Sequence, residues 1–295
     1  MFQFVQLAAH TYYLRCFSNI GVYDNGDGSV ILIDSGDHRK SVSDLDAALE
    51  ERGWRVKMIL VTHSHADHLV GNRFFREKYG CTVYAPEIER FLAAHTALEP
   101  SYNYLGVPVN RRRNFFFKPY GTEIELLQPA LLPPGFEAVP LPGHCLNMVG
   151  IKTPDNVWFL ADAVLAEDSF GEYGLPLFYR VNEAIATARA VAEFKGEWFV
   201  PSHAEAVRDI RPLALYNAAA LEDRKALILR LCPGKTPEEV LCAVGETLAM
   251  TFDMDKYAKV YMTVKCFLQS LIEDGAITAH LEGARLVYDR LETRP

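Results

Sequence analysis

Three of the nine histidines and one aspartate lie within six residues of each other, in the segment VTHSHADHLVG (61–71). These residues are His63, His65, Asp67 and His68. Imidazole nitrogens and carboxylate oxygens are the ligands that a borderline cation such as zinc prefers. Roughly one such pattern is expected by chance in two thousand sequences of this composition. The segment therefore predicts a metal site rather than a polar turn with one hydrogen-bonded histidine.

The elements around the segment explain how four ligands can meet. The run VKMILVTHS (56–64) is typical of a short buried strand, and LVGNRFFREKYG (69–80) has the apolar spacing of a helix. On a strand, positions 63, 65 and 67 would share one face while position 68 would point away. On a turn between a strand and a helix, all four side chains can surround a small volume.

Three further residues of ligand type follow strand-like runs downstream. His144 ends FEAVPLPGH, Asp162 follows NVWFLA, and His203 ends EWFVPSH. Strand ends that share one edge of a sheet are where α/β folds build their sites. These three residues therefore strengthen the prediction of a metal site.

The motifs HSHADH, PGH (142–144), LAD (160–162) and SH (202–203) together resemble the ligand set of the metallo-β-lactamase superfamily, and LIDSG (32–36) resembles its earlier Asp-Gly motif. The resemblance covers residues 1–210. It implies an α/β fold, an αββα sandwich of two mixed β-sheets flanked by helices.

The same resemblance implies a dinuclear centre like that of glyoxalase II. One metal would be held by His63, His65 and His144, and the other by Asp67, His68 and His203, with Asp162 bridging both. Asp34 would lie behind the ligands and orient the turn that carries them.

Two zinc ions per chain are the expected cofactors. His65 stands where the diiron flavoprotein branch of the family usually has glutamate, which favours zinc; iron and manganese in the same ligands are the alternatives. Two cations about 3.5–4 Å apart lower the pKa of a shared water toward about 7. The resemblance thus implies a hydrolase, in which Asp67 accepts or orients the proton of the nucleophile.

The leading hypothesis is a metal-dependent hydrolase that acts on a small ester, thioester or lactone. Asp162 stands where typical β-lactamases of the superfamily carry cysteine, which disfavours antibiotic hydrolysis. A phosphodiesterase or ribonuclease with the same metal site is one alternative. A metal-bound regulatory or nucleic-acid-binding protein is the other.

Candidates for contact with the substrate carry less specific signals. Tyr173 and Arg112 lie on segments expected to flank the site, with packing and an ordinary solvated charge run as the respective alternatives. Cys145, next to His144, is predicted to be a small buried residue rather than a ligand.

Composition sets the broad class of the chain. Its 295 residues, 49% of them hydrophobic, predict a globular protein with a substantial core. The net charge of −8 argues against a general affinity for nucleic acid or an anionic membrane. Scattered cysteines without a CxxC pair, and an N-terminus without a signal-peptide pattern, predict reduced thiols and a cytoplasmic location.

The first part of the chain, 1–210, is predicted to be the catalytic domain. LRCFSNIGVYD (14–24) and SVILIDSG (29–36) read as strands joined by a hairpin at NGDG. SVSDLDAALEERGW (41–54) reads as a helix that Gly53 terminates.

Residues 211–295 are predicted to form a small helical domain of winged-helix type. Amphipathic helices over 217–232, 236–249 and 257–275 precede a hairpin over 276–289, which is the order of that module. Acidic residues slightly outnumber basic ones from 205 onward, whereas a duplex-binding helix needs a positive excess. We therefore expect this domain to pack on the first, to form a homodimer or to close as a lid, and not to bind nucleic acid.

Overall fold

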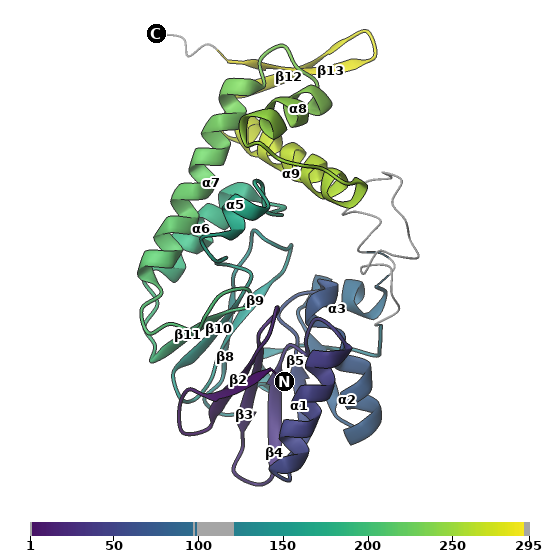
Figure 1. The fold of residues 1–295 in the computed structure, drawn as a ribbon, viewed down its shortest axis with the longest axis vertical. Coiled ribbons are helices and arrows are strands. Elements are labelled where there is room, and N and C mark those ends of the chain that lie inside the picture. Colours follow the sequence, from purple (N-terminus) through teal and green to yellow (C-terminus); the bar gives the residue numbers. More distant parts are fainter. Residues whose placement is uncertain (1, 97, 99–120, 292–295) are drawn as a thin grey trace.

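Two mixed β-sheets form the lower half of the protein in the computed structural model, which describes residues 2–96, 98 and 121–291 (Figure 1). The seven-stranded sheet has the order β1-β2-β3-β4-β5-β6-β7 and the four-stranded sheet the order β11-β10-β9-β8. The strands of the first sheet are β1 (Gln3–Gln6), β2 (Thr11–Arg15), β3 (Ile20–Asp24), β4 (Ser29–Ile33), β5 (Arg55–Leu60), β6 (Thr82–Ala85) and β7 (Glu125–Leu126). Those of the second are β8 (Glu137–Pro140), β9 (Val149–Lys152), β10 (Val157–Ala161) and β11 (Trp198–Pro201).

The direction of the strands changes within each sheet. From β1 to β4 neighbouring strands are antiparallel, and from β4 to β7 they are parallel. In the second sheet β8, β9 and β10 are antiparallel, whereas β10 and β11 are parallel. Predicted ligands follow the carboxyl ends of β5, β10 and β11, so these three strand ends can contribute side chains to one site.

The side chains of β4 show how the layers arise. Val30 and Leu32 pack in a cluster with the helices α1 (Arg39–Glu51) and α2 (Asn72–Tyr79), whereas Ile31 and Ile33 pack in the cluster between the two sheets. Successive residues of a strand point to opposite faces, so an apolar run of this kind requires both faces to be covered. Gly21 lets the sheets approach closely, because a Cβ there would lie 2.6 Å from the ring of Phe159.

The second sheet is covered in the same way. Phe159 of β10 packs toward the first sheet, while Trp158 and Leu160 pack on the outer face with residues of α6 (Val181–Val191) and α7 (Arg211–Leu231). Helices α1, α2 and α3 lie on the side of the seven-stranded sheet (Figure 1). The helices of this region are α1 (Arg39–Glu51), α2 (Asn72–Tyr79), α3 (Glu87–Ala94), α5 (Ser169–Glu172) and α6 (Val181–Val191), with 3-10 turns η1 (Ala66–His68) and η3 (Pro129–Leu131). The predicted αββα sandwich of two mixed β-sheets is confirmed.

Several local predictions hold, and one is wrong. β3 and β4 form the hairpin predicted at 25–28, and Gly53 follows α1 with a left-handed φ of 67°. The run 14–24 is not one strand but two, because a turn separates β2 from β3. At that turn the Asn19 amide donates to the carbonyl oxygens of Pro201 and Ala204, which ties the turn to the end of β11.

Three helices and a hairpin follow the sandwich in the predicted order (Figure 1). They are α7 (Arg211–Leu231), α8 (Pro237–Thr247), α9 (Met254–Glu273), β12 (Ile277–Glu282) and β13 (Arg285–Arg290). Thr236 caps α8, since its hydroxyl accepts from Glu239 N while the Glu239 carboxylate accepts from Thr236 N. The domain boundary at 210 and the winged-helix type stay predictions.

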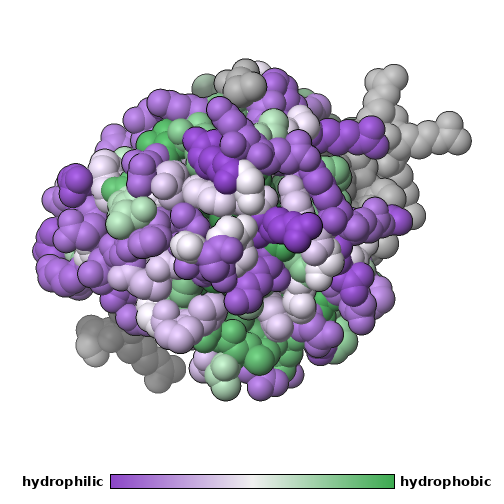
Figure 2. Space-filling model, turned by 90° about the horizontal axis from the view of Figure 1, so that it is seen from below, coloured by the Kyte–Doolittle hydropathy of each residue, from purple (hydrophilic) through white to green (hydrophobic). Residues whose placement is uncertain are grey.

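The core does not stop at that boundary. Phe170 and Phe178, from the sandwich side, share one cluster with Val264, Phe267 and Leu268 of α9. The end of the molecule opposite the C-terminal hairpin carries mainly hydrophilic side chains, with hydrophobic ones in small separate groups (Figure 2). Among the helices of the described residues, none is both long and apolar enough to cross a membrane.

Candidate metal centre

The seven side chains predicted as ligands come together between the ends of the two sheets. His63, His65, Asp67 and His68 lie on the segment between β5 and α2, which includes the turn η1. Asp162 directly follows β10, His203 follows β11, and His144 lies between β8 and β9. The structure therefore places residues from four separate segments of the chain in one cluster, which we divide into a first and a second group.

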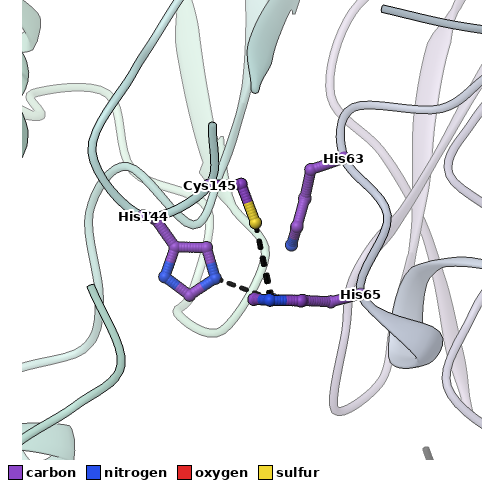
Figure 3. Close-up of side chains that lie close together, drawn as sticks. All are labelled: His63, His65, His144 and Cys145. Atoms are coloured by element: carbon purple, nitrogen blue, oxygen red, sulfur yellow. Dashed lines mark hydrogen bonds between the residues drawn. The ribbon is translucent and has the colours of Figure 1, made fainter. Parts of the chain in front are cut away.

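The first group is His63, His65, His144 and Cys145, whose side chains converge from two separate segments (Figure 3). Taking one ligand atom from each residue, all four atoms lie within 4.8 Å of one another. His65 Nδ1 is 2.9 Å from His144 Nε2, and Cys145 Sγ is 3.4 Å from His65 Nε2. Within the described residues, the buried His63 Nε2 has no hydrogen-bond partner. A buried polar atom normally has a partner, so this nitrogen is available to a metal.

The second group is Asp67, His68 and His203, and its ligand atoms also lie within 4.8 Å of one another. Asp162 lies between the two groups. Its Oδ2 is 3.2 Å from His144 Nε2 and 3.2 Å from His203 Nε2, and its Oδ1 is 3.5 Å from His68 Nε2. One carboxylate thus faces histidines of both groups, as a bridging ligand would.

Asp34 lies behind the ligands and contacts one of them, His68, together with Thr62, which precedes His63. Its Oδ2 accepts hydrogen bonds from His68 Nδ1 and Thr62 Oγ1, both at 2.8 Å, and its Oδ1 accepts one from Thr62 N at 2.8 Å. Asp34 adopts a left-handed φ of 59°, a conformation that aspartate tolerates better than most residues. The carboxylate fixes the His68 ring so that Nε2 faces the second group.

Backbone carbonyls orient two other histidines. His144 Nδ1 donates to Leu177 O, and His203 Nδ1 donates to Phe17 O, each at 2.8 Å. A proton on Nδ1 leaves the Nε2 lone pair free for a metal. Gly143 allows this arrangement, because its φ is +126° and a Cβ there would lie 2.4 Å from the backbone of Ala184.

The electrostatics favour neutral histidines in the first group. Burial and the neighbouring histidines lower the pKa of His63 and of His65 well below the usual value. Burial likewise lowers the pKa of His144. All three rings are therefore neutral near pH 7, which is the form that binds a metal.

In the second group, charges of opposite sign stabilise one another. Burial disfavours the charged form of His68, but the carboxylates of Asp67, Asp34 and Asp162 raise its pKa to about 9. Burial also opposes ionisation of Asp67 and Asp162, but the nearby histidines, His68 and His203 among them, hold the pKa of both carboxyls well below the usual range. The carboxylates are thus ionised and able to bind a cation, and a cation bound by His68 would displace the proton from its Nε2.

A cavity of about 690 Å³ opens onto the two groups. Its lining includes His65, Asp67, His144, Asp162 and His203. The rest of the wall comes from Phe17 and Asp37, from the segment 165–177, which includes Tyr173, and from residues 253–260 at the start of α9. Tyr173 therefore borders the cavity, whereas Arg112 lies outside the described residues.

Sequence reasoning missed two residues that contact this site. Ser18 Oγ donates to Asp67 Oδ2 at 2.7 Å. Glu89 of α3 is fully buried and accepts hydrogen bonds from Ser64 N and Asn147 N. Cys145 is buried, as predicted, although its sulfur also contacts His65.

Comparison with known proteins agrees with the fold. The family model of the metallo-beta-lactamase superfamily matches residues 13–203. A hydroxyacylglutathione hydrolase of Brucella ovis is 26% identical over 191 residues, which make up 63% of this chain and 64% of that protein. One of Brucella anthropi is 26% identical over 196 residues, 63% of each. The matched region thus spans less than two thirds of these relatives.

Solved structures show the same fold over more of the chain. A beta-lactamase domain protein from Burkholderia ambifaria superposes with a TM-score of 0.76 at 15% identity, over 98% of this chain and 94% of that one. A metallo-beta-lactamase family protein from Thermus thermophilus gives a TM-score of 0.65 at 21% identity, over 93% and 94%. With the family match over residues 13–203, we conclude that the chain belongs to the metallo-β-lactamase superfamily.

Proposed function

We propose that this protein is a metal-dependent hydrolase that acts on a small ester, thioester or lactone. The observation that carries the proposal is the position of Asp162, whose carboxylate faces His144 of the first group and His68 and His203 of the second. A carboxylate that reaches both sets of ligands could hold two cations close together, as two-metal hydrolytic sites require.

The donor set fits two divalent cations. His63, His65 and His144 would hold one, Asp67, His68 and His203 the other, and Asp162 would contact both. Two such cations, when bound, lower the pKa of a shared water and polarise the carbonyl oxygen of the substrate. Nitrogen and oxygen donors of this kind favour zinc, with iron or manganese as alternatives.

The protein's own groups would direct the proton and the substrate. Asp67 borders the cavity, and Ser18 Oγ donates to its Oδ2. This hydrogen bond fixes the carboxylate, so that Asp67 can orient the attacking water or take up its proton. Tyr173 and Phe17, both partly exposed at the cavity, offer aromatic surface to the apolar part of a substrate.

The size of the cavity supports a small substrate. Cavities that bind small molecules typically enclose about 300–1,000 Å³, and this one has about 690 Å³. The hydroxyacylglutathione hydrolases of Brucella support an acyl compound as the substrate class. A cytoplasmic location and the absence of a nucleic-acid partner stay predictions from composition.

The test combines metal analysis with a substrate panel. Protein purified without chelators should contain about two metal ions per chain, and it should hydrolyse a thioester, lactone or ester in preference to phosphodiesters and β-lactams. His65→Ala and Asp162→Ala should each abolish turnover while the circular dichroism spectrum is retained. His280→Ala, an exposed histidine of the C-terminal hairpin, is the matched control and should keep full activity. Preferred cleavage of phosphodiesters would refute the substrate class, and protein without metal would refute the centre itself.

A further inference from the structure

Helix α3 carries a charged residue on its buried side. Glu89 has no solvent-exposed surface, whereas Glu87, two residues earlier on the same helix, is exposed. A carboxylate is costly to bury unless hydrogen bonds satisfy it. The partners of Glu89 therefore indicate what it does.

Both partners are backbone amides of the loops that carry the first group. Glu89 Oε2 accepts from Ser64 N at 3.0 Å, and Glu89 Oε1 accepts from Asn147 N at 2.9 Å. Ser64 lies between His63 and His65, and Asn147 lies three residues after His144. Each carboxylate oxygen thus holds one of the two loops.

These loops belong to different sheets. The loop of Ser64 follows β5 of the seven-stranded sheet, and the loop of Asn147 connects β8 and β9 of the four-stranded sheet. The facing nitrogens of His65 and His144 are only 2.9 Å apart, so a small shift of one loop would change the spacing of the ligands. Asn147 Oδ1 also accepts from Ile88 N at 3.4 Å, which is a second contact between α3 and the same loop.

The second group is positioned by other partners. Asp34 orients His68, Phe17 O orients His203, and Ser18 orients Asp67. Loss of the Glu89 carboxylate should therefore weaken metal binding by the first group more than metal binding by the second group.

We propose that Glu89 is a positioning residue that holds the loops of Ser64 and Asn147 at the separation the first group needs to bind a metal. This inference rests on the proposed dinuclear centre. It concerns metal binding by His63, His65 and His144 and needs no knowledge of the substrate.

The experiment compares Glu89→Gln with Glu87→Gln, which makes the same chemical change on the exposed side of the same helix. In Glu89→Gln the amide nitrogen of the side chain faces a backbone N–H, so one of the two hydrogen bonds is lost. Each protein is loaded with two equivalents of zinc and titrated with a competing chelator. Replacement of residues behind metal ligands typically weakens binding by about 10–100-fold. We expect a loss of this size for one zinc ion in Glu89→Gln, and unchanged binding of both ions in Glu87→Gln.

The outcomes separate this inference from the proposed function. If the unmodified protein binds no zinc, the dinuclear centre is wrong and the role of Glu89 falls with it. If the unmodified protein binds two ions and Glu89→Gln binds both equally well, only the role of Glu89 is wrong. A lower melting temperature with equal weakening of both ions would show a general structural role and would also overturn the inference. Should Glu89→Gln fail to fold, Glu89→Asp keeps the carboxylate but shortens its reach, and it should weaken the same single ion.

Discussion

Replacing Asp34 by asparagine should weaken the second metal while leaving the fold intact. The backbone of residue 34 has a φ of 59°, which asparagine tolerates as well as aspartate. The amide side chain can still accept from Thr62 N through its remaining oxygen. The change therefore concerns Oδ2, the atom that accepts from His68 Nδ1 and Thr62 Oγ1.

The size of the effect follows from those contacts. An amide nitrogen cannot accept the proton of His68 Nδ1, so the ring either loses this hydrogen bond or moves its proton to Nε2. Nε2 is the atom that lies 3.5 Å from Asp162 Oδ1, where the metal is proposed to bind. Such a change behind a ligand costs about 10–100-fold in metal affinity. The loss of one hydrogen bond to a charged acceptor costs about 1.5–3 kcal/mol of unfolding free energy.

Chelator competition on zinc-loaded protein measures the affinity, and urea unfolding measures the stability. Asp155→Asn is the matched control, because Asp155 Oδ2 also accepts from a backbone N–H and a threonine hydroxyl, those of His10 and Thr11, which belong to neither group. We expect Asp34→Asn to release one ion at a chelator concentration that Asp155→Asn resists. The reasoning is refuted if Asp34→Asn binds two ions with affinities within about threefold of the unmodified protein, since a lost orienting contact should cost more.

Two further predictions concern other parts of the structure. Gly143→Ala should lower the unfolding free energy by about 2–4 kcal/mol, because the new Cβ would lie 2.4 Å from Ala184 at a φ of +126°. Gly28→Ala, at a φ of +81° with nothing within 4 Å, should lower the unfolding free energy less in the same urea titration. Equal losses in the two variants would show that the contact with Ala184 does not contribute. In thiol labelling of native protein at pH 8, Cys242 should react first because it is exposed, whereas burial raises the pKa of Cys81 to about 11. Cys242→Ser should remove this fast reaction. If the fast reaction persisted in Cys242→Ser, Cys242 would not be the thiol that reacts first.

The sequence was informative about the ligands because their chemical types are rare in such close spacing. HSHADH could be recognised as a metal motif before its surroundings were known, and strand-like runs before Asp162 and His203 indicated a shared sheet edge. The structure brings all of these residues together. Their roles in binding metal stay predictions.

What could not be predicted depends on contacts between distant segments. Glu87 and Glu89 are the same residue type two positions apart, and only the fold decides which one is buried. The break between β2 and β3 depends on Asn19 reaching the end of β11, which lies far along the chain. The contribution of α9 to the cavity likewise arises from tertiary packing, which no local pattern records.

The core shared by α5, α6 and α9 has a consequence for how the protein is made. His203 is the last of the proposed ligands to be synthesised, and it leaves the ribosome about 50 residues ahead of Met254, where α9 begins. The sandwich can therefore assemble its ligands while Phe170 and Phe178 still lack their partners on α9. The same late helix buries these side chains and completes the cavity wall. A nascent chain that stalls after His203 and before α9 would expose the apolar side chains of Phe170 and Phe178 to chaperones. Its ligand cluster would lack the cavity wall that α9 provides.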